Sequence, residues 1–367
     1  MRIAVITRHA IANYGSLLQA MATQHVIESM GHTCEIIDYV RDDESYSQHE
    51  KTILKRKSEW NDNPIKRGLY LCIRQPESIL AGRKFEKAQN KYLKLTPRYA
   101  NKEELLSKVP VADVYMTGSD QVWGSVGDGS CDSAYCLSFT KDGDKRIAYA
   151  ASFGHTDMTS ELEDYYKKWL SRYAHIAVRE DSAVSIVKNL GMDAYQVIDP
   201  TLLLDSDFWK MFEVPIKQKK YVLVYQLHND KRLGEYALKV ANAMRLPLMR
   251  ISTSFHQITR EGKLVWCPEI GEFLSYIRNA ECMITDSFHG TAFAINFNTP
   301  FVEVLPNNNT GTRNMSILKL TGLSNRILQD ETNIGLAREK IEFNNANNIL
   351  KEKRIESMRI LKRMIEK

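Results

Sequence analysis

Residues 1–39 read MRIAVITRHAIANYGSLLQAMATQHVIESMGHTCEIIDY, and this segment is the clearest guide to the architecture of the chain. An apolar run predicts a strand at Arg2–Thr7, and the pattern that follows predicts a helix at Gly15–Met30. Gly31 fits the left-handed position that ends many helices, and Thr33–Tyr39 predicts the next strand. A strand, a helix and a second strand in this order form a βαβ unit, so we expect two parallel neighbouring strands.

The same alternation of short apolar runs and helical stretches continues through most of the 367 residues. It predicts further strands at Val111–Thr117, Arg146–Ser152, His175–Val178, Tyr195–Ile198, Tyr221–His228, Pro247–Ser252, Cys282–Thr285 and Phe301–Leu305. It predicts helices at Arg232–Met244, Ile270–Asn279 and Gly290–Asn298. The pattern indicates an α/β fold with mainly parallel sheets, and a chain of this length is expected to form two domains.

Changes in composition suggest where the chain divides. The stretch Val214–Lys220 combines a proline with solvated charge, so we expect residues 1–213 to form the first domain and residues 214–335 the second. Residues 41–100 are polar, basic and partly helical, which is typical of an insertion or a lid. A long basic helix, Ile334 to about Ile365, is expected to end the chain, with residues 336–367 packing back on the first domain.

The net charge of +5 hides a strong asymmetry along the chain. Residues 51–98 carry 13 basic and 4 acidic side chains, a net charge of +9, whereas residues 1–50 and 99–337 each sum to −4. Positive charge confined to one segment indicates an anionic partner surface, and no nucleic-acid-binding motif supports a duplex-binding groove. We therefore expect no nucleic-acid partner, but peripheral contact of residues 51–98 with an anionic membrane or a lipid-linked diphosphate. A solvated lid explains the same charge without any partner.

The sequence also bears on the compartment of the protein. The N-terminus turns polar after Ile6, and no apolar run reaches 18 residues. Six cysteines are scattered without a C-x-x-C pair, which indicates reduced thiols and no metal site. These features predict a cytoplasmic protein, either free or held peripherally at the inner face of the membrane.

Ligands of open α/β sheets bind beyond the carboxyl ends of the strands, so the loops after the predicted strands are where a site is expected. Asn13-Tyr14-Gly15 follows the first strand, and its glycine lets a ligand approach the start of a helix. Gly118-Ser119-Asp120-Gln121 follows a second strand and continues into Val122-Trp123. A tight turn and a helix cap explain these two loops without a ligand.

Charged side chains follow two later strands. Arg179 comes directly after a short apolar strand, where its planar guanidinium suits a carboxylate or phosphate, with a surface ion pair as the alternative. Within Asp286-Ser287-Phe288-His289-Gly290, His289 is expected beside free backbone amides that hold an anion, with a core histidine as the alternative. The loop Asn307–Arg313 is expected to bring a second arginine to the same sheet edge. Two arginines, a histidine and amide-rich turns describe a site for a doubly anionic small molecule.

At these motifs the sequence resembles the polysaccharide pyruvyl transferase family. The motifs that carry the resemblance are, in order, Asn13-Tyr14-Gly15 with Leu18-Gln19, Gly118-Ser119-Asp120-Gln121-Val122-Trp123, Tyr149–Gly154, Val178-Arg179-Glu180, Asp199–Leu203 and Asp286–Gly290. Several motifs in the expected order are more specific than any one of them. The insertion at 41–100 departs from the family pattern and leaves the acceptor unspecified.

The resemblance implies two Rossmann-like domains that face each other across a cleft, an architecture similar to GT-B glycosyltransferases. It also implies transfer of the pyruvyl group of phosphoenolpyruvate to a sugar of a polysaccharide or of its lipid-linked precursor. Such a reaction forms a cyclic ketal, releases phosphate, needs no cofactor beyond phosphoenolpyruvate as co-substrate, and serves exopolysaccharide or capsule synthesis. In family members, residues that match Arg179, His289 and Arg313 line the phosphoenolpyruvate site.

Within that resemblance, chemistry assigns roles to the candidate residues. His289 is expected to transfer a proton or bind phosphate, and Asp120 or Asp286 to act as general base, unless either is a structural cap. The remaining substrate-binding candidates are Arg179, Arg313, Ser287, Phe288, Gly290, Asn13, Tyr14, Gly15, Gly118, Ser119 and Gln121. A GT-B-type glycosyltransferase that uses a sugar nucleotide is the alternative, because a fold alone does not decide a reaction. A non-catalytic anion-binding module recruited to membranes is a further alternative, but it gives the two arginines and His289 no role.

Overall fold

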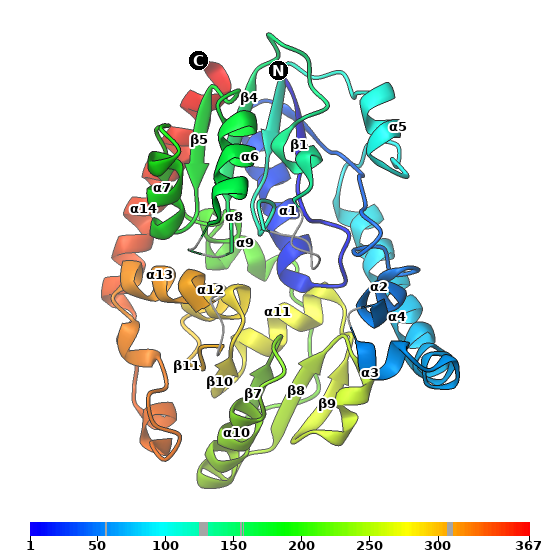
Figure 1. The fold of residues 1–367 in the computed structure, drawn as a ribbon. Coiled ribbons are helices and arrows are strands. Elements are labelled where there is room, and N and C mark those ends of the chain that lie inside the picture. The colour runs from blue at the N-terminus through cyan, green and yellow to red at the C-terminus, as the bar shows by residue number, and fades with distance from the viewer. Residues whose placement is uncertain (56, 125–130, 155, 157, 307–310) are drawn as a thin grey trace.

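The computed structural model describes residues 1–55, 57–124, 131–154, 156, 158–306 and 311–367. It contains two parallel sheets with helices on their faces, one above the other in Figure 1. The first sheet has six strands in the order β2-β1-β3-β4-β5-β6, and the second has five in the order β11-β10-β7-β8-β9. The predicted α/β class with two parallel-sheet domains is therefore confirmed.

The first βαβ unit has the predicted form. β1 (Arg2–Ile6) pairs in parallel with β2 (Thr33–Ile36) on one side and with β3 (Val114–Thr117) on the other. Helix α1 (Tyr14–Ser29) connects β1 to β2 and is buried along most of its length. Gly31, which follows this helix, has a φ of 84°, a conformation that glycine adopts without strain.

The other strands of the first sheet also lie at predicted positions along the chain. β4 (Arg146–Ala151), β5 (His175–Val178) and β6 (Tyr195–Gln196) begin at their predicted residues. The connecting helices are α5 (Lys102–Ser107), α6 (Ser160–Leu170), α7 (Asp181–Asn189), α8 (Pro200–Leu203) and α9 (Ser206–Lys210). Because all strands are parallel, their carboxyl ends share one edge of the sheet, and this edge faces the second sheet (Figure 1).

The second sheet contains one strand that the sequence did not predict. β7 (Val222–Tyr225), β8 (Leu248–Ser252), β10 (Cys282–Thr285) and β11 (Phe301–Glu303) match predicted strands, with α10 (Lys231–Met244), α11 (Ile270–Arg278) and α12 (Phe288–Phe297) among them. β9 (Lys263–Trp266) is the addition, and it pairs with β8 at the sheet edge. Its residues are half-buried or exposed, so it lacks the apolar run that marks a central strand. The predicted junction at Val214–Lys220 lies between α9 and β7.

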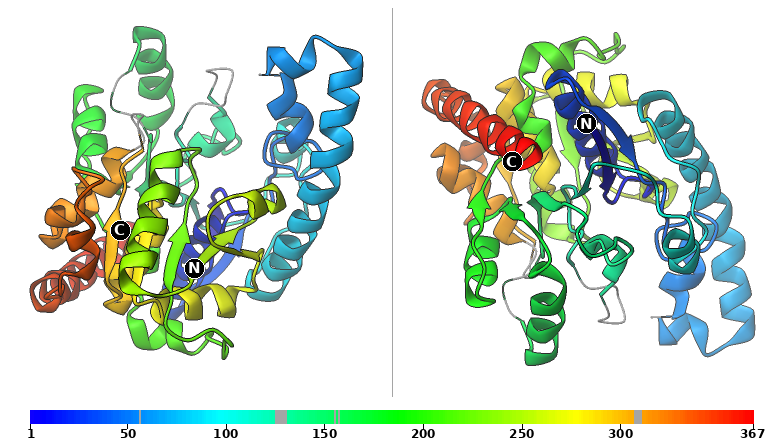
Figure 2. Two further views of the ribbon diagram at one scale, coloured as in Figure 1. Left: turned by 90° about the horizontal axis from the view of Figure 1, so that it is seen from below. Right: turned by 90° about the horizontal axis from the view of Figure 1, so that it is seen from above.

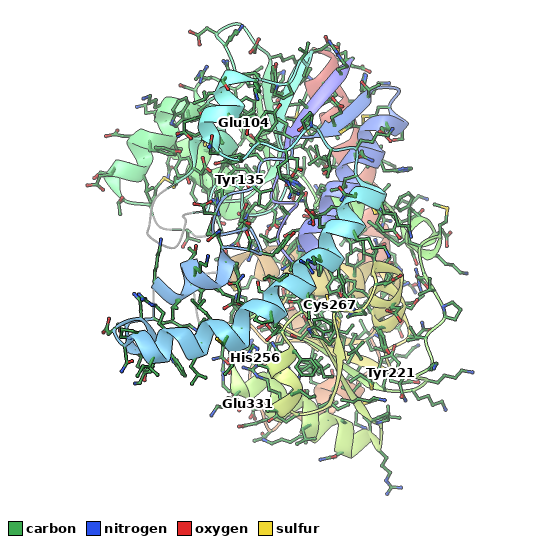
Figure 3. The ribbon with its side chains drawn as sticks, turned by 90° about the vertical axis from the view of Figure 1, so that its right-hand side faces the viewer. Glu104, Tyr135, Tyr221, His256, Cys267 and Glu331 are labelled. Carbon is green, nitrogen blue, oxygen red and sulfur yellow. The ribbon has the colours of Figure 1, made fainter. Side chains whose placement is uncertain are left out.

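Most of the insertion at 41–100 forms a helical projection. α2 (His49–Lys55) and α3 (Ser58–Asn61) pack against α4 (Pro64–Tyr92), a helix of 29 residues. The projection stands apart from the sheets in Figure 2, and Figure 3 shows α4 lying across the boundary between the two domains. Asn63 caps α4 and Pro64 opens it, at a position where no backbone donor is needed.

The chain ends in α14 (Asn344–Glu366), which packs back against the first domain as predicted. The Lys145 Nζ atom, for example, donates to the carbonyl oxygen of Ile365 at 2.6 Å. The predicted start at Ile334 is wrong, because Ile334–Arg338 forms a separate 3₁₀ turn. Arg326 donates to the carbonyl oxygen of Leu336 and so takes an acceptor that a continuous helix would use. Within the described ranges, none of the helices has the length and apolar character of a membrane-spanning segment.

Candidate active site

The first helix of the chain meets the second domain at Gly15. Asn13 caps α1, and its Oδ1 accepts hydrogen bonds from the backbone N–H groups of Gly15 at 2.8 Å and Ser16 at 3.3 Å. A Cβ atom on Gly15 would lie 2.0 Å from Nδ1 of His289, so the glycine backbone packs directly against the imidazole. The loop after β1 and the start of α12 therefore face each other at the domain boundary.

Tyr14 holds α1 against the second domain. Its ring stacks on Phe273 with the centroids 4.1 Å apart, and its hydroxyl donates to the carbonyl oxygen of Pro268 at 2.5 Å. Both partners belong to the second domain, so Tyr14 helps to set the position of Gly15 against His289. The substrate contact expected for Tyr14 stays a prediction.

His289 lies buried in the first turn of α12. Ser287 caps this helix, and its Oγ accepts from the N–H of Gly290 at 3.2 Å. Nε2 of His289 lies 3.7 Å from Oδ2 of Asp199, and it forms no hydrogen bond with any residue that the structure describes. One ring nitrogen is therefore available to a ligand, next to a carboxylate from the first domain.

Asp199 organises the first-domain side of this cluster, although the sequence analysis gave it no role. Oδ2 accepts from Ser119 Oγ and from Arg179 Nη1, both at 2.9 Å, and Oδ1 accepts from the N–H and hydroxyl of Thr201 at 2.9 and 2.7 Å. Burial alone would raise the pKa of Asp199, but His289, Arg179 and Thr201 hold it well below its usual range. The available signal was its position after the strand that begins at Tyr195, in one of the motifs of the resemblance.

Arg179 and Arg313 both carry buried N–H groups that lack acceptors. Arg179 lies over the ring of Phe288, 4.2 Å from its centroid, and its Nε and Nη2 have no hydrogen-bond partner among the described residues. Arg313 lies in the first turn of α13 (Thr312–Thr321) rather than in the predicted loop, and its Nε lacks a partner in the same part of the chain. Residues 307–310 of that loop lie outside the described residues.

The two arginines also repel each other. Burial, and after it the positive charge of Arg179, lower the pKa of Arg313 to about 10. An anion bound between them would supply the missing acceptors and relieve the repulsion. The pair is therefore suited to a small molecule with more than one negative charge.

Asp120 lies beside the same cluster, just after β3. Its φ of 75° is unusual for a residue other than glycine, and its carboxylate accepts from Ser16 Oγ at 2.5 Å and from the N–H of Gln121 at 2.8 Å. Burial would raise its pKa, but His289, Arg179 and Arg8 lower it to about 2. Asp120 is thus ionised at neutral pH, and this favours balancing positive charge over accepting a proton.

Asp286, the other candidate base, is engaged within its own domain. Oδ1 accepts from the N–H of Leu227 at 2.7 Å, and Oδ2 accepts from the N–H of His228 at 2.9 Å and lies 3.1 Å from its Nδ1. These bonds hold the loop after β7 against the start of α12. The bonding favours a positioning role, and the role of Asp286 as base stays a prediction.

The remaining candidates shape the loop that carries Ser119 and Asp120. A Cβ on Gly118 would lie 3.0 Å from Cβ of Thr7, so the close approach there favours glycine. The side chain of Gln121 lies against Gly154, where a Cβ would come within 2.2 Å of its Nε2. No group of three or more His, Cys, Asp and Glu side chains among the described residues is arranged to hold a metal ion.

A cavity of about 490 Å³ adjoins this cluster, between the first domain, the insertion and the second domain. Arg8 and Asn13 link the two, because both line the cavity while the charge of Arg8 acts on Asp120 and Asn13 caps the helix of Gly15. Much of the polar lining comes from the insertion: Asp43, Glu44, Tyr46, His49, Glu50, Glu77 and Ser78. The volume lies within the range of about 300–1,000 Å³ typical of ligand sites, and the lining suits a ligand with many hydroxyls.

A family model described as polysaccharide pyruvyl transferase matches residues 13–309. A comparison with curated protein sequences finds no match. Among solved structures, the chain is similar to Arabidopsis thaliana UGT89C1 complexed with quercetin, with 12% identity, a TM-score of 0.49 and coverage of 99% of each chain. It is also similar to UDP-GlcNAc 2-epimerase from Neisseria meningitidis bound to UDP-GlcNAc, with 10% identity, a TM-score of 0.49 and coverage of 99% of this chain and 100% of the other. The residues matched by the family model include Asn13, Asp120, Arg179 and His289, whereas Arg313 lies beyond them.

Proposed function

Because the chain belongs to the polysaccharide pyruvyl transferase family, we propose that this transferase moves the pyruvyl group of phosphoenolpyruvate onto two hydroxyls of a sugar. The buried pair of Arg179 and Arg313, with N–H groups that lack acceptors, is the observation that carries the donor assignment. Phosphoenolpyruvate has a carboxylate and a phosphate, and both are acceptors that a guanidinium binds well. The family match also favours this reaction over glycosyl transfer from a sugar nucleotide.

The proposed reaction begins at the methylene carbon of phosphoenolpyruvate. That carbon takes a proton from His289 and becomes a methyl group. The neighbouring carbon, C2, is then cationic. The first sugar hydroxyl forms a bond to C2 and loses its proton, and the bond from C2 to the phosphate oxygen then breaks with its electron pair on phosphate. The second hydroxyl adds to C2 and closes the ketal. Of the two hydroxyl protons, one replaces the proton that His289 gave, and the other leaves on phosphate.

Two carboxylates support this role for His289. Asp199 lies 3.7 Å from Nε2, and both Asp199 and Asp120 stay ionised at neutral pH because the surrounding positive charge lowers their pKa values. Their negative charge offsets the positive charge of the two arginines and of a proton held on the imidazole. Asp120 therefore serves the reaction as an electrostatic partner in this proposal.

Donor binding in this proposal requires the domains to separate. The cavity that touches Arg179, Arg313 and Phe288 has a volume of about 10 Å³, room for one water molecule at most. The donor reaches the buried arginines when the contact between Gly15 and His289 loosens. Closure afterwards excludes water, which would otherwise compete with the sugar for the cationic C2.

The sugar acceptor is assigned to the cavity of about 490 Å³. Its carboxylates, together with Tyr46 and His49, supply hydrogen-bond partners for hydroxyl groups. Arg8 and Asn13 place it next to the donor cluster, so two hydroxyls of one sugar can reach C2 from the same side. A sugar of a polysaccharide or of its lipid-linked precursor fits this arrangement.

Two measurements test the proposal. Phosphoenolpyruvate should raise the melting temperature of the full chain, whereas a sugar nucleotide should not, because only a ligand of the folded protein stabilises it. Phosphate release from phosphoenolpyruvate should depend on an added glycan acceptor, and mass analysis should show the ketal. Arg179→Lys should abolish most of the melting shift, and Arg172→Lys, on the same domain but outside the cluster, should keep it. Stabilisation by a sugar nucleotide alone would contradict the proposal.

A further inference from the structure

One face of α4 carries apolar side chains that are largely exposed. Four aliphatic side chains on this face are exposed by half or more: Ile65 (82%), Leu69 (53%), Ile73 (61%) and Leu80 (53%). Spacings of three, four and seven residues place side chains on one side of a helix, and these four follow that rule. Three lysines continue the row at the same kind of spacing: Lys84, Lys87 and Lys91. We call these seven residues the α4 face.

Positive charge lies beside the α4 face. Lys66 and Arg83 are exposed next to it on the same helix, and neither pairs with a carboxylate among the described residues. They belong to the segment 51–98, whose net charge is +9, whereas the flanking residues 1–50 and 99–337 are both net negative. An exposed apolar row with unpaired basic side chains beside it is the pattern of an interfacial helix.

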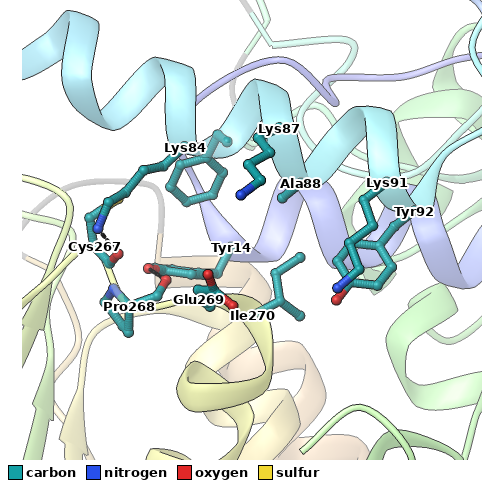
Figure 4. Close-up of a pocket in the computed structure, with 11 residues that line it drawn as sticks. Tyr14, Lys84, Lys87, Ala88, Lys91, Tyr92, Cys267, Pro268, Glu269 and Ile270 are labelled. Atoms are coloured by element: carbon teal, nitrogen blue, oxygen red, sulfur yellow. Dashed lines mark hydrogen bonds between the residues drawn. The ribbon is translucent and has the colours of Figure 1, made fainter. Parts of the chain in front are cut away.

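The lysine end of the α4 face borders a cavity of about 380 Å³ between α4 and the second domain. Figure 4 shows Lys87 and Lys91 pointing into this cavity, toward Tyr14 and Ile270. Glu269 also lines this cavity, but the three lysines outnumber that carboxylate, and the cavity is net positive. Cations above aromatic and aliphatic side chains suit a phosphate-bearing headgroup with an apolar chain attached.

We propose that the α4 face docks the protein on an anionic lipid bilayer. The four aliphatic side chains enter the interface, and Lys87 and Lys91 contact headgroup phosphates, whereas Lys84 donates to the carbonyl oxygen of Cys267. A bilayer is the partner that offers an anionic layer directly above an apolar one. A symmetric pair of chains would instead set two basic segments against each other, and nucleic acid would leave the aliphatic row against a charged backbone.

Docking through this face has a consequence for the acceptor cavity. Ser78, on the opposite side of α4, lines the cavity of about 490 Å³. The bilayer surface would then lie about one helix diameter, roughly 10–12 Å, from that cavity. A sugar attached to a membrane lipid could reach it. This consequence rests on the proposed function, whereas the docking itself does not.

Flotation of the full chain with liposomes tests the docking. The protein should float with phosphatidylcholine vesicles that contain phosphatidylglycerol and stay unbound with phosphatidylcholine alone. Leu69→Asn combined with Ile73→Asn should raise the lipid concentration for half-maximal binding by about tenfold or more, because two apolar side chains leave the interface. Lys87→Gln combined with Lys91→Gln should have an effect of similar size that shrinks at high salt.

Helix α14 offers matched controls. Ile355 is 65% exposed there and Lys351 is exposed as well, so Ile355→Asn and Lys351→Gln make the same chemical changes on another basic helix. Both should bind vesicles like the unmodified chain. Because all the substituted residues are on the surface, every variant should also melt like the unmodified chain.

Cys72 supplies a second readout. It is exposed on α4 between Leu69 and Ile73, whereas the other five cysteines are buried or half-buried. An environment-sensitive fluorophore attached to Cys72 should brighten with anionic vesicles, and the same labelling of Cys72→Ser should give no response. Equal flotation of the α4 and α14 variants, equal binding to neutral vesicles, or a dimer that Ile73→Asn abolishes would overturn the proposal. None of these outcomes affects phosphate release measured with a soluble acceptor.

Discussion

Replacing Gly15 by alanine should displace His289 without removing any functional group. A Cβ at this position would lie 2.0 Å from Nδ1, 2.3 Å from Cγ and 2.8 Å from Cβ of the histidine. Tyr14 stacks on Phe273 and holds the start of α1 against the second domain, so the helix cannot rotate to relieve the clash. Either the imidazole moves or the two domains part at this point.

The size of the displacement follows from the contact distances. Ordinary contacts of a Cβ atom begin near 3.4 Å, so the ring must move by about 1.4 Å. A misplacement of about 1 Å at a reacting group can cost about 100-fold in rate, and overpacking costs about 1–3 kcal/mol of stability. We therefore expect Gly15→Ala to lower kcat for phosphate release by about 100-fold or more and to lower the melting temperature by a few degrees.

The assay follows phosphate release from phosphoenolpyruvate with acceptor present, together with thermal melting. Gly68→Ala on α4 is the matched control, because a Cβ there meets nothing within 4 Å. This control should keep full activity and gain about 0.5–1 kcal/mol of stability, since alanine favours a helix over glycine. Unchanged kcat and melting temperature in Gly15→Ala would refute the close packing of the two domains at His289.

Three further predictions concern single substitutions. Arg179→Lys or Arg313→Lys keeps the positive charge but loses the planar guanidinium, which costs roughly 1.5–3 kcal/mol per charge-assisted hydrogen bond. Calorimetry should therefore show at least about tenfold weaker binding of phosphoenolpyruvate. Unchanged affinity in both variants would make these arginines structural. His289→Gln should melt near the unmodified chain yet release phosphate about 10²–10⁴-fold more slowly, and a rate near that of the unmodified chain would exclude proton transfer by His289. Burial raises the pKa of Glu303 to about 8, so the stability that this carboxyl provides is complete below about pH 4 and declines as the pH rises toward 8. Glu303→Gln should then raise the free energy of unfolding by up to about 3 kcal/mol at pH 7 but not at pH 4, in urea titrations at the two pH values.

Strands buried on both faces were the most predictable part of the fold. β5 and β10 match their predicted bounds at both ends, because a covered parallel strand stands out as a short apolar run. The edge strand β9 and the start of α14 were not predicted correctly, because both depend on contacts with distant parts of the chain. One depends on pairing with β8, and the other on a hydrogen bond from Arg326 to Leu336. Such contacts between distant residues leave no pattern in the local sequence.

Parallel topology explains which part of the site could be predicted. Asp120 and Arg179 follow strands of one sheet, so their convergence at one edge follows from strand direction alone. The contact of Gly15 with His289, and the shared position of His289 and Arg179 around Asp199, depend on how two separate sheets face each other. No spacing within the sequence encodes that relation. The insertion was likewise recognised as basic, but its acidic contribution to the large cavity was not.

Each domain holds only half of the donor site in the proposed reaction. The first supplies Arg179, Asp199 and Asp120, and the second supplies His289 and Arg313. When the domains close without a donor, the two guanidinium groups are buried near each other while some of their N–H groups still lack acceptors. Burial, and after it the charge of Arg179, lower the pKa of Arg313 as a result. A donor with two anionic groups removes the repulsion between the two arginines and links the domains. Binding of phosphoenolpyruvate and closure should therefore favour each other, so that His289 reaches the methylene carbon only after water has been excluded.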